Sequence, residues 1–496
     1  MTGAPGVTRA PRATGTRAQA VPAAKPRAAS GGKAASRPAK AAARPKPKRS
    51  TLATVWDSPL ATYYLVAGVT ATLLAIGLVM VLSSSAVTQI AKGNSPFGVF
   101  LQQAQYALIG IPLLLVAAHV PVRIYKRFAW VGLIGALALQ CLVFVPGISK
   151  EVGGNRSWIH VGGSVQFQPA EVAKLALVVW LATVLGRKQR LLGQARHAII
   201  PAVPGALLVI GLVLVGKDLG TALVVMMLVV GAFFVAGVPL RLLVAGMGIG
   251  GIFVWQLFLN GNSNRGGRIS VLLKGCDPNG ANAQELCYQT IHGMQALGSG
   301  GLTGVGLGAS RQAWGYLPAA SNDFIFAIIG EELGLLGAGL VLVLVGLLGY
   351  ACYRVVRRHE DPFAKVAAAA IGCWIVGQSL VNVGVVIGVI PVIGVPLPLI
   401  SAGGSALVTT LVAMGILLSL ARTEPGTSEA LAARPSIARR TLGVVAGAGR
   451  RSPRTPVRSG GSTQSARKAQ PAPSARSGRK SPSGRKAHRG RERPAR

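Results

Sequence analysis

The sequence predicts an all-α membrane protein, a bundle of ten transmembrane helices flanked by disordered, basic cytoplasmic tails. Three observations predict this fold class. Apolar runs of about 20 residues, long enough to cross the hydrocarbon core as helices, recur through residues 56–421. Charged residues make up only 13% of the chain, although its formal net charge is +38. The Lys and Arg residues between the apolar runs gather in alternate loops, as they do in multi-pass proteins.

The apolar runs define the expected spans and their orientation. We predict spans at 60–82, 97–119, 128–145, 171–186, 198–215, 219–237, 240–259, 323–350, 366–390 and 400–421. Positive charge clusters in the loops 121–127, 186–197 and 350–365, which places these loops and both termini in the cytoplasm. The basic leader before the first span is far too long for a removable signal peptide.

Both ends of the chain are expected to be disordered. Residues 1–50 carry 12 Lys or Arg and no acidic residue, and residues 422–496 carry 19 Lys or Arg against three Glu. Both segments have too few large apolar residues to offset the entropy cost of folding. We therefore expect a tail at 1–55, a membrane domain at 56–421 and a second tail at 422–496.

The charge of the tails indicates their partners. Nucleic-acid binding would normally add aromatic or structured reading elements among the cations, and these are missing, so we expect no nucleic acid as a partner. Attraction to the anionic lipids of the cytoplasmic leaflet, or to acidic proteins, fits the composition better. A plain solvated tail is the remaining alternative.

The outer face is expected to carry polar loops. They are 83–96, 146–170, the turn at Lys217 and Asp218, the long loop 260–322 and the turn 391–399. A simple membrane anchor would not need such loops, whereas long loops on one face commonly carry function. No repeat and no inverted pair of broken helices is evident in the sequence, which disfavours a transporter.

Acidic residues mark the start of the eighth predicted span. Ser321 or Asn322 is expected to cap this helix, with Asp323 in the first turn, where the helix dipole favours an acid. Glu331 and Glu332 lie about two turns deeper, where carboxylates are costly and usually face a polar partner. We expect both to be structural partners of polar groups on neighbouring spans.

Two other predicted helix starts on the outer face carry charges. Pro169 suits a first helical turn, and Glu171 and Lys174 are spaced i,i+3, so that they can share one face. Taken alone, this pair is best interpreted as a structural ion pair. Asp218 precedes the sixth span and is best interpreted as its N-cap.

The long outer loop adds cations, glycines and cysteines. It contains Arg265 and Arg268, and the stretch 298–308 has Gly-x-Gly spacing. Because no Walker lysine follows, a flexible loop is favoured over a phosphate site. Cys276 and Cys287 could form a disulfide if the loop faces an oxidising compartment, and the sequence leaves this question open. The sequence has no Cys or His spacing typical of zinc and no hydrolase triad pattern.

Several motifs match one protein family in the same order. They are 168–174 (QPAEVAK), 218–221 (DLGT), 304–308 (GVGLG), 323–334 (DFIFAIIGEELG) and 397–405 (LPLISAGGS). Over residues 60–421 the chain thereby resembles the SEDS proteins of bacterial cell-wall synthesis. Its FIFAIIGEE stretch is more similar to the division members of that family than to the elongation members.

The resemblance implies a ten-span peptidoglycan glycosyltransferase of the bacterial cytoplasmic membrane, acting at the division septum on lipid II and the growing glycan strand. It implies a class B penicillin-binding protein and other division proteins as partners. The family's catalytic aspartate corresponds to Asp323. The residues that the resemblance makes candidates for substrate binding are Glu171, Lys174, Asp218, Ser401, Gly403 and Gly404.

This chain departs from the family's usual pattern beside the aspartate. Ala319, Ser321 and Asn322 stand where the family commonly has Glu, His and Thr. Lys217 replaces a common proline, and Ala402 replaces a frequent tyrosine. These departures concern the flanking positions only.

The residues make the implied chemistry intelligible. Transfer of a sugar to a hydroxyl needs a base for the hydroxyl and positive charge for the diphosphate leaving group. We expect Asp323 to be the base of an inverting transfer. The candidates for holding the diphosphate are Lys174, Arg156 and the pair Arg265 and Arg268. No cofactor is certain, and a divalent cation, Mg²⁺ or Mn²⁺, could share the second task.

Two other functions stay open from the sequence. A lipid II flippase would also use a polar outer cavity. Its transport of labelled lipid II would not depend on Asp323. A membrane scaffold would depend on its basic tails to recruit division partners and would tolerate the loss of Asp323. We favour glycan polymerisation, with recruitment by the tails as an added role.

Overall fold

The computed structural model describes residues 58, 60–152, 155–160, 166–259, 276, 287–427 and 429. Its compact unit ends at Thr427. Most of the predicted tails, and both Arg265 and Arg268, lie outside the described residues. The disorder of the tails therefore stays a prediction.

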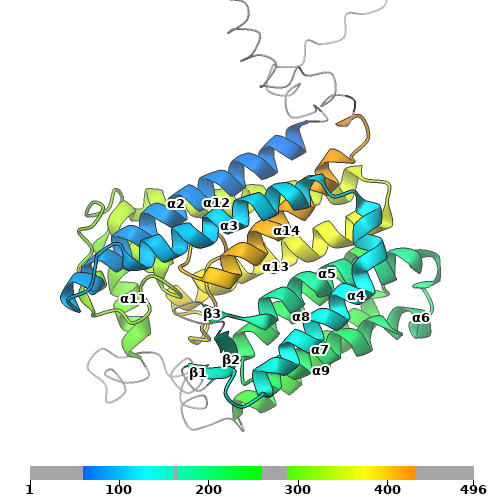
Figure 1. Ribbon diagram of the computed structural model, residues 1–496, viewed down its shortest axis with the longest axis horizontal. Coiled ribbons are helices and arrows are strands. Elements are labelled where there is room, and N and C mark those ends of the chain that lie inside the picture. The colour runs from blue at the N-terminus through cyan, green and yellow to red at the C-terminus, as the bar shows by residue number, and fades with distance from the viewer. Residues whose placement is uncertain are drawn as a thin grey trace, which may run out of the picture. The chain divides into compact units, whose positions relative to one another are not determined.

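Long helices form the bundle (Figure 1). They are α2 (Ala61–Ala91), α3 (Gly98–His119), α4 (Val122–Cys141), α5 (Pro169–Arg187), α7 (Ala202–Val215), α8 (Leu219–Ala236), α9 (Leu240–Leu259), α12 (Ile325–Arg358), α13 (Pro362–Val386) and α14 (Gly404–Arg422). Among the described residues, nine helices are long and apolar enough to cross a membrane. The seventh predicted span coincides with α9, whose apolar part Leu240–Phe253 is shorter. The all-α membrane class is confirmed, whereas the count of ten is not.

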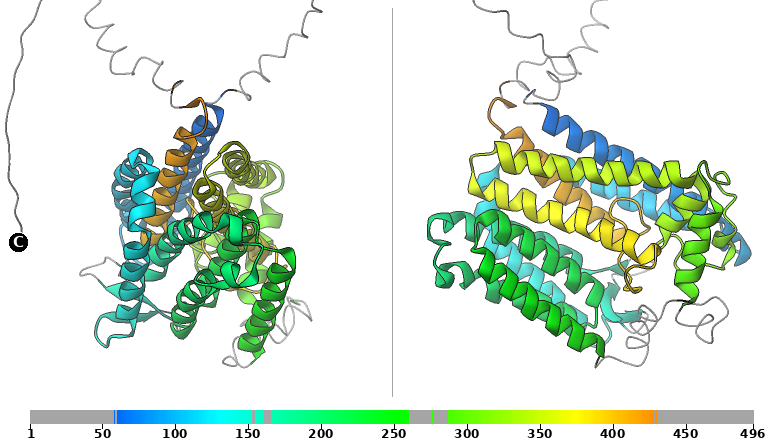
Figure 2. Two further views of the ribbon diagram at one scale, coloured as in Figure 1. Left: turned by 90° about the vertical axis from the view of Figure 1, so that its right-hand side faces the viewer. Right: turned by 180° about the vertical axis from the view of Figure 1, so that it is seen from behind.

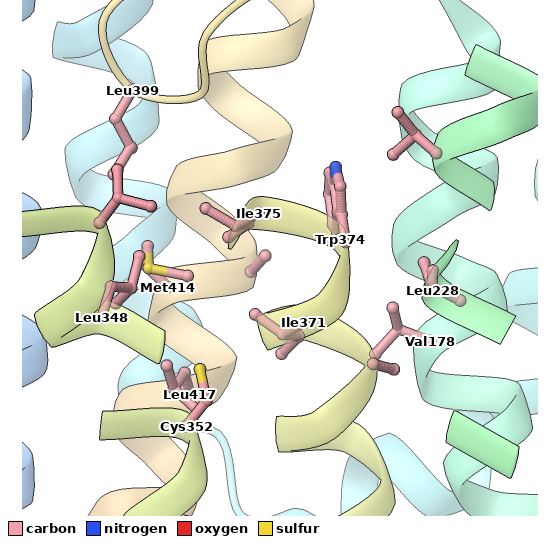
Figure 3. Packing of buried hydrophobic residues seen from close by; sticks show 14 of the residues in the cluster. Val178, Leu228, Leu348, Cys352, Ile371, Trp374, Ile375, Leu399, Met414 and Leu417 are labelled. Atoms are coloured by element: carbon pink, nitrogen blue, oxygen red, sulfur yellow. The ribbon is translucent and has the colours of Figure 1, made fainter. Parts of the chain in front are cut away.

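Helix α13 lies at the centre of the bundle. It packs against α5 and α8 on one side and against α12 on the other. Figure 3 shows Trp374 and Ile371 of α13 between Val178 of α5 and Leu228 of α8 on one side and Met414 of α14 on the other. All five side chains are almost fully buried. Because α13 is covered in this way, any polar group on it needs a partner inside the protein.

The two described ends of the chain meet at one end of the bundle (Figure 2). The hydroxyl of Thr62, near the start of α2, donates to Oε2 of Glu424, which follows α14, at 3.1 Å. Nε of Arg354, near the end of α12, donates to the same hydroxyl at 3.1 Å. Glu424 and Thr62 are 2% and 0% exposed. The folded unit therefore continues past residue 421.

The opposite end of the bundle, which we call the loop end, carries a small sheet and a short helix. Strands β1 (Ser149–Val152), β2 (Asn155–His160) and β3 (Gln166–Phe167) pair antiparallel in the order β1-β2-β3. Helix α11 (Tyr288–Ser299) lies at the same end. Residues 146–170 were expected to form a loop. The strands escaped prediction because strands this short show no measurable alternation of apolar and polar residues.

Helix α2 is longer than the apolar run from which it was predicted. Residues 83–91, expected in a loop, continue the helix. Their polar side chains bind the protein: Oγ of Ser83 donates to Oε2 of Glu332 at 2.6 Å, and Oγ1 of Thr88 donates to the carbonyl of Ala313 at 2.9 Å. Hydropathy ends the span early because it does not register such partners.

Helix α12 is broken at Gly334, and a loop docks into the break. Gly334 has φ 67° and ψ −167°, a conformation that is almost exclusive to glycine. Four backbone hydrogen bonds of 2.9–3.1 Å join loop 300–308 to the helix on both sides of the break: Val305 N to Glu331 O, Gly306 N to Glu332 O, Leu335 N to Gly301 O and Leu336 N to Leu302 O.

This docking explains the glycine pattern of the loop. Gly304 has φ 83°, and a Cβ on it would overlap the backbone of Glu332. A Cβ on Gly300 would overlap the carbonyl of Gly330. The glycines therefore allow two backbones to approach closely. The expected flexible loop was wrong in this respect, since the segment is bonded to α12.

Candidate functional site

Asp323 lies at the loop end, in the segment that leads into α12. The helix has Phe324 as its N-cap residue and no side-chain cap. The predicted caps, Ser321 or Asn322, and the placement of Asp323 within the first turn were therefore wrong. The chain turns earlier instead, because the amides of Asn322 and Phe324 both donate to the carbonyl of Ala319, which is left-handed with φ 55°.

The carboxylate of Asp323 is suited to accept a proton. Its side chain is partly exposed, and no group within the described part of the chain donates a hydrogen bond to it. Loss of hydration in this position raises the pKa of Asp323 to about 6, and the negative charge of Asp218 adds to the rise. The group is therefore ionised at neutral pH and yet basic enough to be protonated during a reaction.

Asp218 caps α8, as the sequence predicted. Its Oδ1 accepts from the amide of Thr221 at 2.9 Å. Its Oδ2 accepts from Oγ1 of Thr221 at 2.9 Å and from Nε2 of Gln168 at 2.8 Å. Both oxygens are thus occupied by the protein, and Lys217 before it holds a left-handed backbone with φ 61°.

The turn 391–395 brings the two acids together. A Cβ on Gly220, at the start of α8, would overlap the backbone of this turn. A Cβ on Gly394 would contact Oδ2 of Asp323 at 3.6 Å. The start of α8 and the Asp323 segment therefore contact the same turn, which is why Asp218 influences the pKa of Asp323.

Glu171 and Lys174 form the expected ion pair in α5. Nζ of Lys174 lies 2.8 Å from Oε1 of Glu171, and both side chains are almost fully buried. The ammonium also lies 4.8 Å from the ring centroid of Trp374 and 3.4 Å from Oε1 of Gln378. Burial raises the pKa of Asp218, and the charge of Lys174 opposes this rise. Lys174 is therefore enclosed and acts on Asp218 through its electric field.

Arg156 lies beside the turn that carries Asp218. Its amide, on β2, donates to the carbonyl of Gly216 at 3.0 Å, and its side chain is exposed. The sheet, which was not predicted, thus holds the backbone of Arg156 beside the turn that carries Asp218. The other cationic candidates, Arg265 and Arg268, lie outside the described residues.

The small residues after the ninth span support the Asp323 segment. Oγ of Ser401 donates to the carbonyl of Asn322 at 2.7 Å. The amide of Gly403 donates to Oε1 of Gln103 on α3 at 3.2 Å. A Cβ on Gly404 would overlap the ring of Tyr106. Substrate binding by Ser401, Gly403 and Gly404 stays a prediction.

Glu331 and Glu332 have the structural partners that the sequence analysis expected. Oγ of Ser310 and the amide of Arg311 donate to the two carboxylate oxygens of Glu331. Ser83 on α2 donates to Glu332. These partners of Glu331, Ser310 and Arg311, directly follow loop 300–308 and do not lie on a neighbouring span. Both carboxylates therefore help to hold the loop end together.

Cys276 and Cys287 are joined in a disulfide. Cys287 directly precedes α11 and packs with Ile291, so the bridge ties the start of this helix to the long loop. The sequence left the pairing open because it depends on the compartment that the loop faces.

Sequence reasoning overlooked the buried amide side chains. Four such side chains are each less than a tenth exposed, and each forms a hydrogen bond with a segment of the site: Gln103, Gln168, Gln378 and Asn382. A signal was present for the two on α13, because a polar side chain inside an apolar span is costly unless it has partners.

Comparison with known sequences identifies the family. The family model for FtsW, RodA and SpoVE, described as "Cell cycle protein", matches residues 63–425. The "Probable peptidoglycan glycosyltransferase FtsW" of Mycobacterium tuberculosis is 36% identical over 375 residues, which cover 76% of this chain and 70% of that protein. The "Stage V sporulation protein E" of Bacillus subtilis is 35% identical over 355 residues, 71% of this chain and 95% of that protein.

Solved structures show the same fold. A chain from "Structural coordination of polymerization and crosslinking by a peptidoglycan synthase complex" matches 73% of this chain and 98% of its own length, with a TM-score of 0.59 and 27% identity. The rod shape determining protein RodA of Thermus thermophilus matches 73% of this chain and 97% of its own, with a TM-score of 0.52 and 25% identity. The motifs described above all lie within the matched residues. The chain therefore belongs to the FtsW/RodA/SpoVE family of cell cycle proteins.

Proposed function

We propose that this multi-pass membrane protein is a peptidoglycan glycosyltransferase that polymerises lipid II into glycan strands during septal cell-wall synthesis. One observation carries the proposal beyond family membership. A partly exposed carboxylate, Asp323, stands at the loop end under the charge of Asp218, and the turn that carries Asp218 is bonded to the backbone of the exposed Arg156 and lies within the field of the enclosed Lys174. A base next to positive charge is what sugar transfer from a diphosphate requires.

In this mechanism Asp323 acts as the general base. It takes the proton of the acceptor 4-hydroxyl while that oxygen attacks the anomeric carbon of the donor. The bond from the anomeric carbon to the diphosphate oxygen breaks, and the diphosphate leaves with the electron pair. Attack from the side opposite the leaving group inverts the anomeric centre.

The diphosphate needs a cation that can reach it, and two of the four candidates, Lys174 and Arg156, are among the described residues. Lys174 is 1% exposed and already bonded to Glu171, so it cannot contact a diphosphate without breaking a buried ion pair. Arg156 is exposed and presents a planar fork of donors that suits phosphate oxygens. We assign diphosphate binding to Arg156, and to Lys174 a longer-range electrostatic role.

A divalent cation does not fit a protein-held site in the described part of the chain. No group of three or more His, Cys, Asp or Glu side chains there could hold a metal ion. Asp218, the acid nearest Asp323, has both oxygens occupied by Thr221 and Gln168. We therefore derive no step through a metal.

The substrate and the partners follow from the membrane setting. The lipid tail of lipid II would lie along the apolar surface of the bundle, with its sugars at the loop end on the outer side. We further propose a class B penicillin-binding protein as the transpeptidase partner, since the similar solved structure is described as a peptidoglycan synthase complex that coordinates polymerization and crosslinking. Other division proteins, and anionic lipids that attract the basic tails, complete the proposed assembly at the septum.

A reconstitution experiment tests the function directly. The purified full-length protein, together with its class B penicillin-binding protein, is incubated with fluorescent lipid II, and glycan strands are resolved by gel electrophoresis. Strands that depend on this protein support a polymerase. Absence of strands, with labelled lipid II crossing the bilayer of proteoliposomes, would identify a flippase instead.

The polymerisation rate is expected to fall as the pH drops through about 6. The folded pKa of Asp323 is raised to about 6, so the base loses its charge over about pH 5–7. An ordinary carboxyl group is protonated only at a lower pH, near its pKa of about 4. At pH 5 roughly a tenth of the plateau rate should persist. Asp218→Asn, which removes the neighbouring negative charge, should move this midpoint to lower pH. A rate that stays flat down to pH 5 would contradict the assignment.

Arg156→Ala is expected to weaken lipid II use. Loss of a charge-assisted hydrogen bond costs about 1.5–3 kcal/mol, which corresponds to a decrease in kcat/KM of roughly 10-fold to 100-fold. Arg156→Lys keeps the charge but lacks the planar fork of donors. Its kcat/KM should lie between those of the wild type and Arg156→Ala. Arg190→Ala, at the opposite end of the bundle, is the matched control and should leave kcat/KM unchanged. Equal activity of the Arg156 and Arg190 variants would remove Arg156 from the site.

A further inference from the structure

Two amide side chains on α13 lie where the bundle is otherwise apolar. Gln378 and Asn382 are spaced i,i+4, so that they share one face of the helix, and they are 4% and 1% exposed. Amides at such depth cost free energy unless their hydrogen bonds are made. Their partners therefore indicate what this helix face holds in place.

Asn382 joins the two segments that flank the candidate base. Its Nδ2 donates to the carbonyl of Asp323 at 2.7 Å and to the carbonyl of Val395 at 2.8 Å. Its Oδ1 accepts no hydrogen bond from the described residues. The amide thus bonds only backbone, and one of its two acceptors belongs to Asp323 itself.

Both bridged segments contain strained backbone. Within the described residues, the non-glycine positions with positive φ are Lys217, Ala319 and Leu399. Ala319 lies four residues before Asp323, and Leu399 lies four residues after Val395. Such conformations persist only where the surroundings enforce them, and they are common at functional sites. Asn382 bonds each of the two segments four residues away from such a position.

Gln378 connects the same turn to the buried ion pair. Its Nε2 donates to the carbonyl of Pro396 at 2.7 Å. Its Oε1 accepts from Nε1 of Trp374 at 3.0 Å and from Nζ of Lys174 at 3.4 Å. One face of α13 therefore links Lys174, the turn and the Asp323 segment, and α13 and α14 are the two most enclosed of the nine candidate spans among the described residues.

We propose that Asn382 is a positioning residue for sugar transfer: by bonding the backbone of Asp323 and of Val395 it fixes the direction in which the Asp323 carboxylate points. This inference rests on the proposed role of Asp323 as the base. Gln378 fixes the same turn relative to Lys174. The charged groups that act on the carboxylate are Asp218 directly, and Glu171 and Lys174 through Asp218.

The test compares Asn382→Ala and Asn382→Asp with Ser379→Ala. Asn382→Ala removes both donated hydrogen bonds, and Asn382→Asp keeps the size of the side chain but, when ionised, donates none. Ser379 is a matched control, because it is 1% exposed on the same helix and its Oγ bonds only the carbonyl of Ile375 one turn earlier. Each full-length variant is assayed with lipid II and the transpeptidase partner for kcat, KM and the pH dependence of the rate.

Both Asn382 variants should lose kcat with little change in KM. A misplacement of about 1 Å at a reacting group lowers the rate by roughly 100-fold, whereas KM should change by less than about 3-fold. In Asn382→Ala the acidic midpoint should move to lower pH, because a loosened segment lets water reach the carboxylate. In Asn382→Asp the added negative charge opposes this shift, so the midpoint is taken from the alanine variant. A purely structural role would lower the unfolding temperature without moving this midpoint. Ser379→Ala should change none of the three quantities.

The outcomes separate this inference from the proposed function. If Asp323→Asn is inactive, both Asn382 variants keep the wild-type kcat and Asn382→Ala keeps the wild-type midpoint, the inference is overturned and the base stays assigned. If Asp323→Asn is fully active, the role of the base fails, and the inference fails with it. If neither Asn382 variant folds, Ser401→Ala is used instead, because it removes the hydroxyl donor to the carbonyl of Asn322. Its kcat and acidic midpoint then decide the outcome.

Discussion

Asp323→Asn is expected to abolish glycan polymerisation while the protein stays folded. Asparagine has the size of aspartate but cannot take a proton from the acceptor hydroxyl. Loss of a positioned general base lowers a rate by roughly 10²–10⁴-fold, which would bring strand synthesis below detection in most gel assays. The measurement is the yield of glycan strands from fluorescent lipid II.

Folding should survive because the structure does not use the Asp323 carboxylate. Asn382 bonds the backbone carbonyl of Asp323, which the substitution keeps, and no described residue donates to the side chain. The unfolding temperature in detergent should therefore be no lower than that of the wild type, since asparagine also avoids the cost of a poorly hydrated charge. Asp361→Asn is a useful contrast: it weakens the cap of α13 and the ion pair with Lys126, so it should cost stability and leave the chemistry intact. Strand synthesis by Asp323→Asn at the wild-type rate would exclude this residue as the base.

Gly304→Ala is expected to undo the docking of loop 300–308 and to inactivate the protein. The left-handed conformation alone costs about 1–2 kcal/mol for a residue with a Cβ. Overlap with the backbone of Glu332 adds about 1–3 kcal/mol, because neither the loop nor the helix can shift without breaking their mutual hydrogen bonds. Together these terms are a large part of the stability of a typical protein.

A matched glycine in the same loop isolates the effect of docking. Gly306 also has positive φ, 104°, but a Cβ there would meet no atom within 4 Å. Gly306→Ala should therefore carry only the conformational cost and a smaller fall in unfolding temperature. Gly346→Ala in α12, where a Cβ is also unopposed, should be close to neutral. If Gly304→Ala and Gly306→Ala were equally stable and equally active, close approach of the loop to α12 would not matter.

The parts that the sequence predicted best depend on local patterns. Span positions follow from hydropathy, and α9 and α13 were recognised from it. Asp218 as a cap and Glu171 with Lys174 as a pair follow from spacings of three residues within one helix. The closeness of Asp323 to Asp218 could not be predicted from pattern, since the two are joined only through the turn 391–395.

The errors arose where partners are distant in the chain. Asp323 was predicted to be a first-turn acid, yet the hydrogen bonds that set the helix start run to Ala319 and to Ser401, which lies 79 residues from Asn322. The Gly-x-Gly spacing looked like a free loop because its partner, the break at Gly334, lies 30 residues later than Gly304. Hydropathy also hid Asn382, whose function depends on two carbonyls outside its own helix.

The buried Glu424 decides where the basic C-terminal segment can be cut away. A shortened chain that stopped at residue 421, the end of the last apolar run, would remove the acceptor of the Thr62 hydroxyl and open the seam between α2 and the segment that follows α14. Its loss of activity would be mistaken for failed recruitment of a partner. A chain shortened after Thr427 keeps this seam closed, and only such a variant reports on what the charged tail itself contributes.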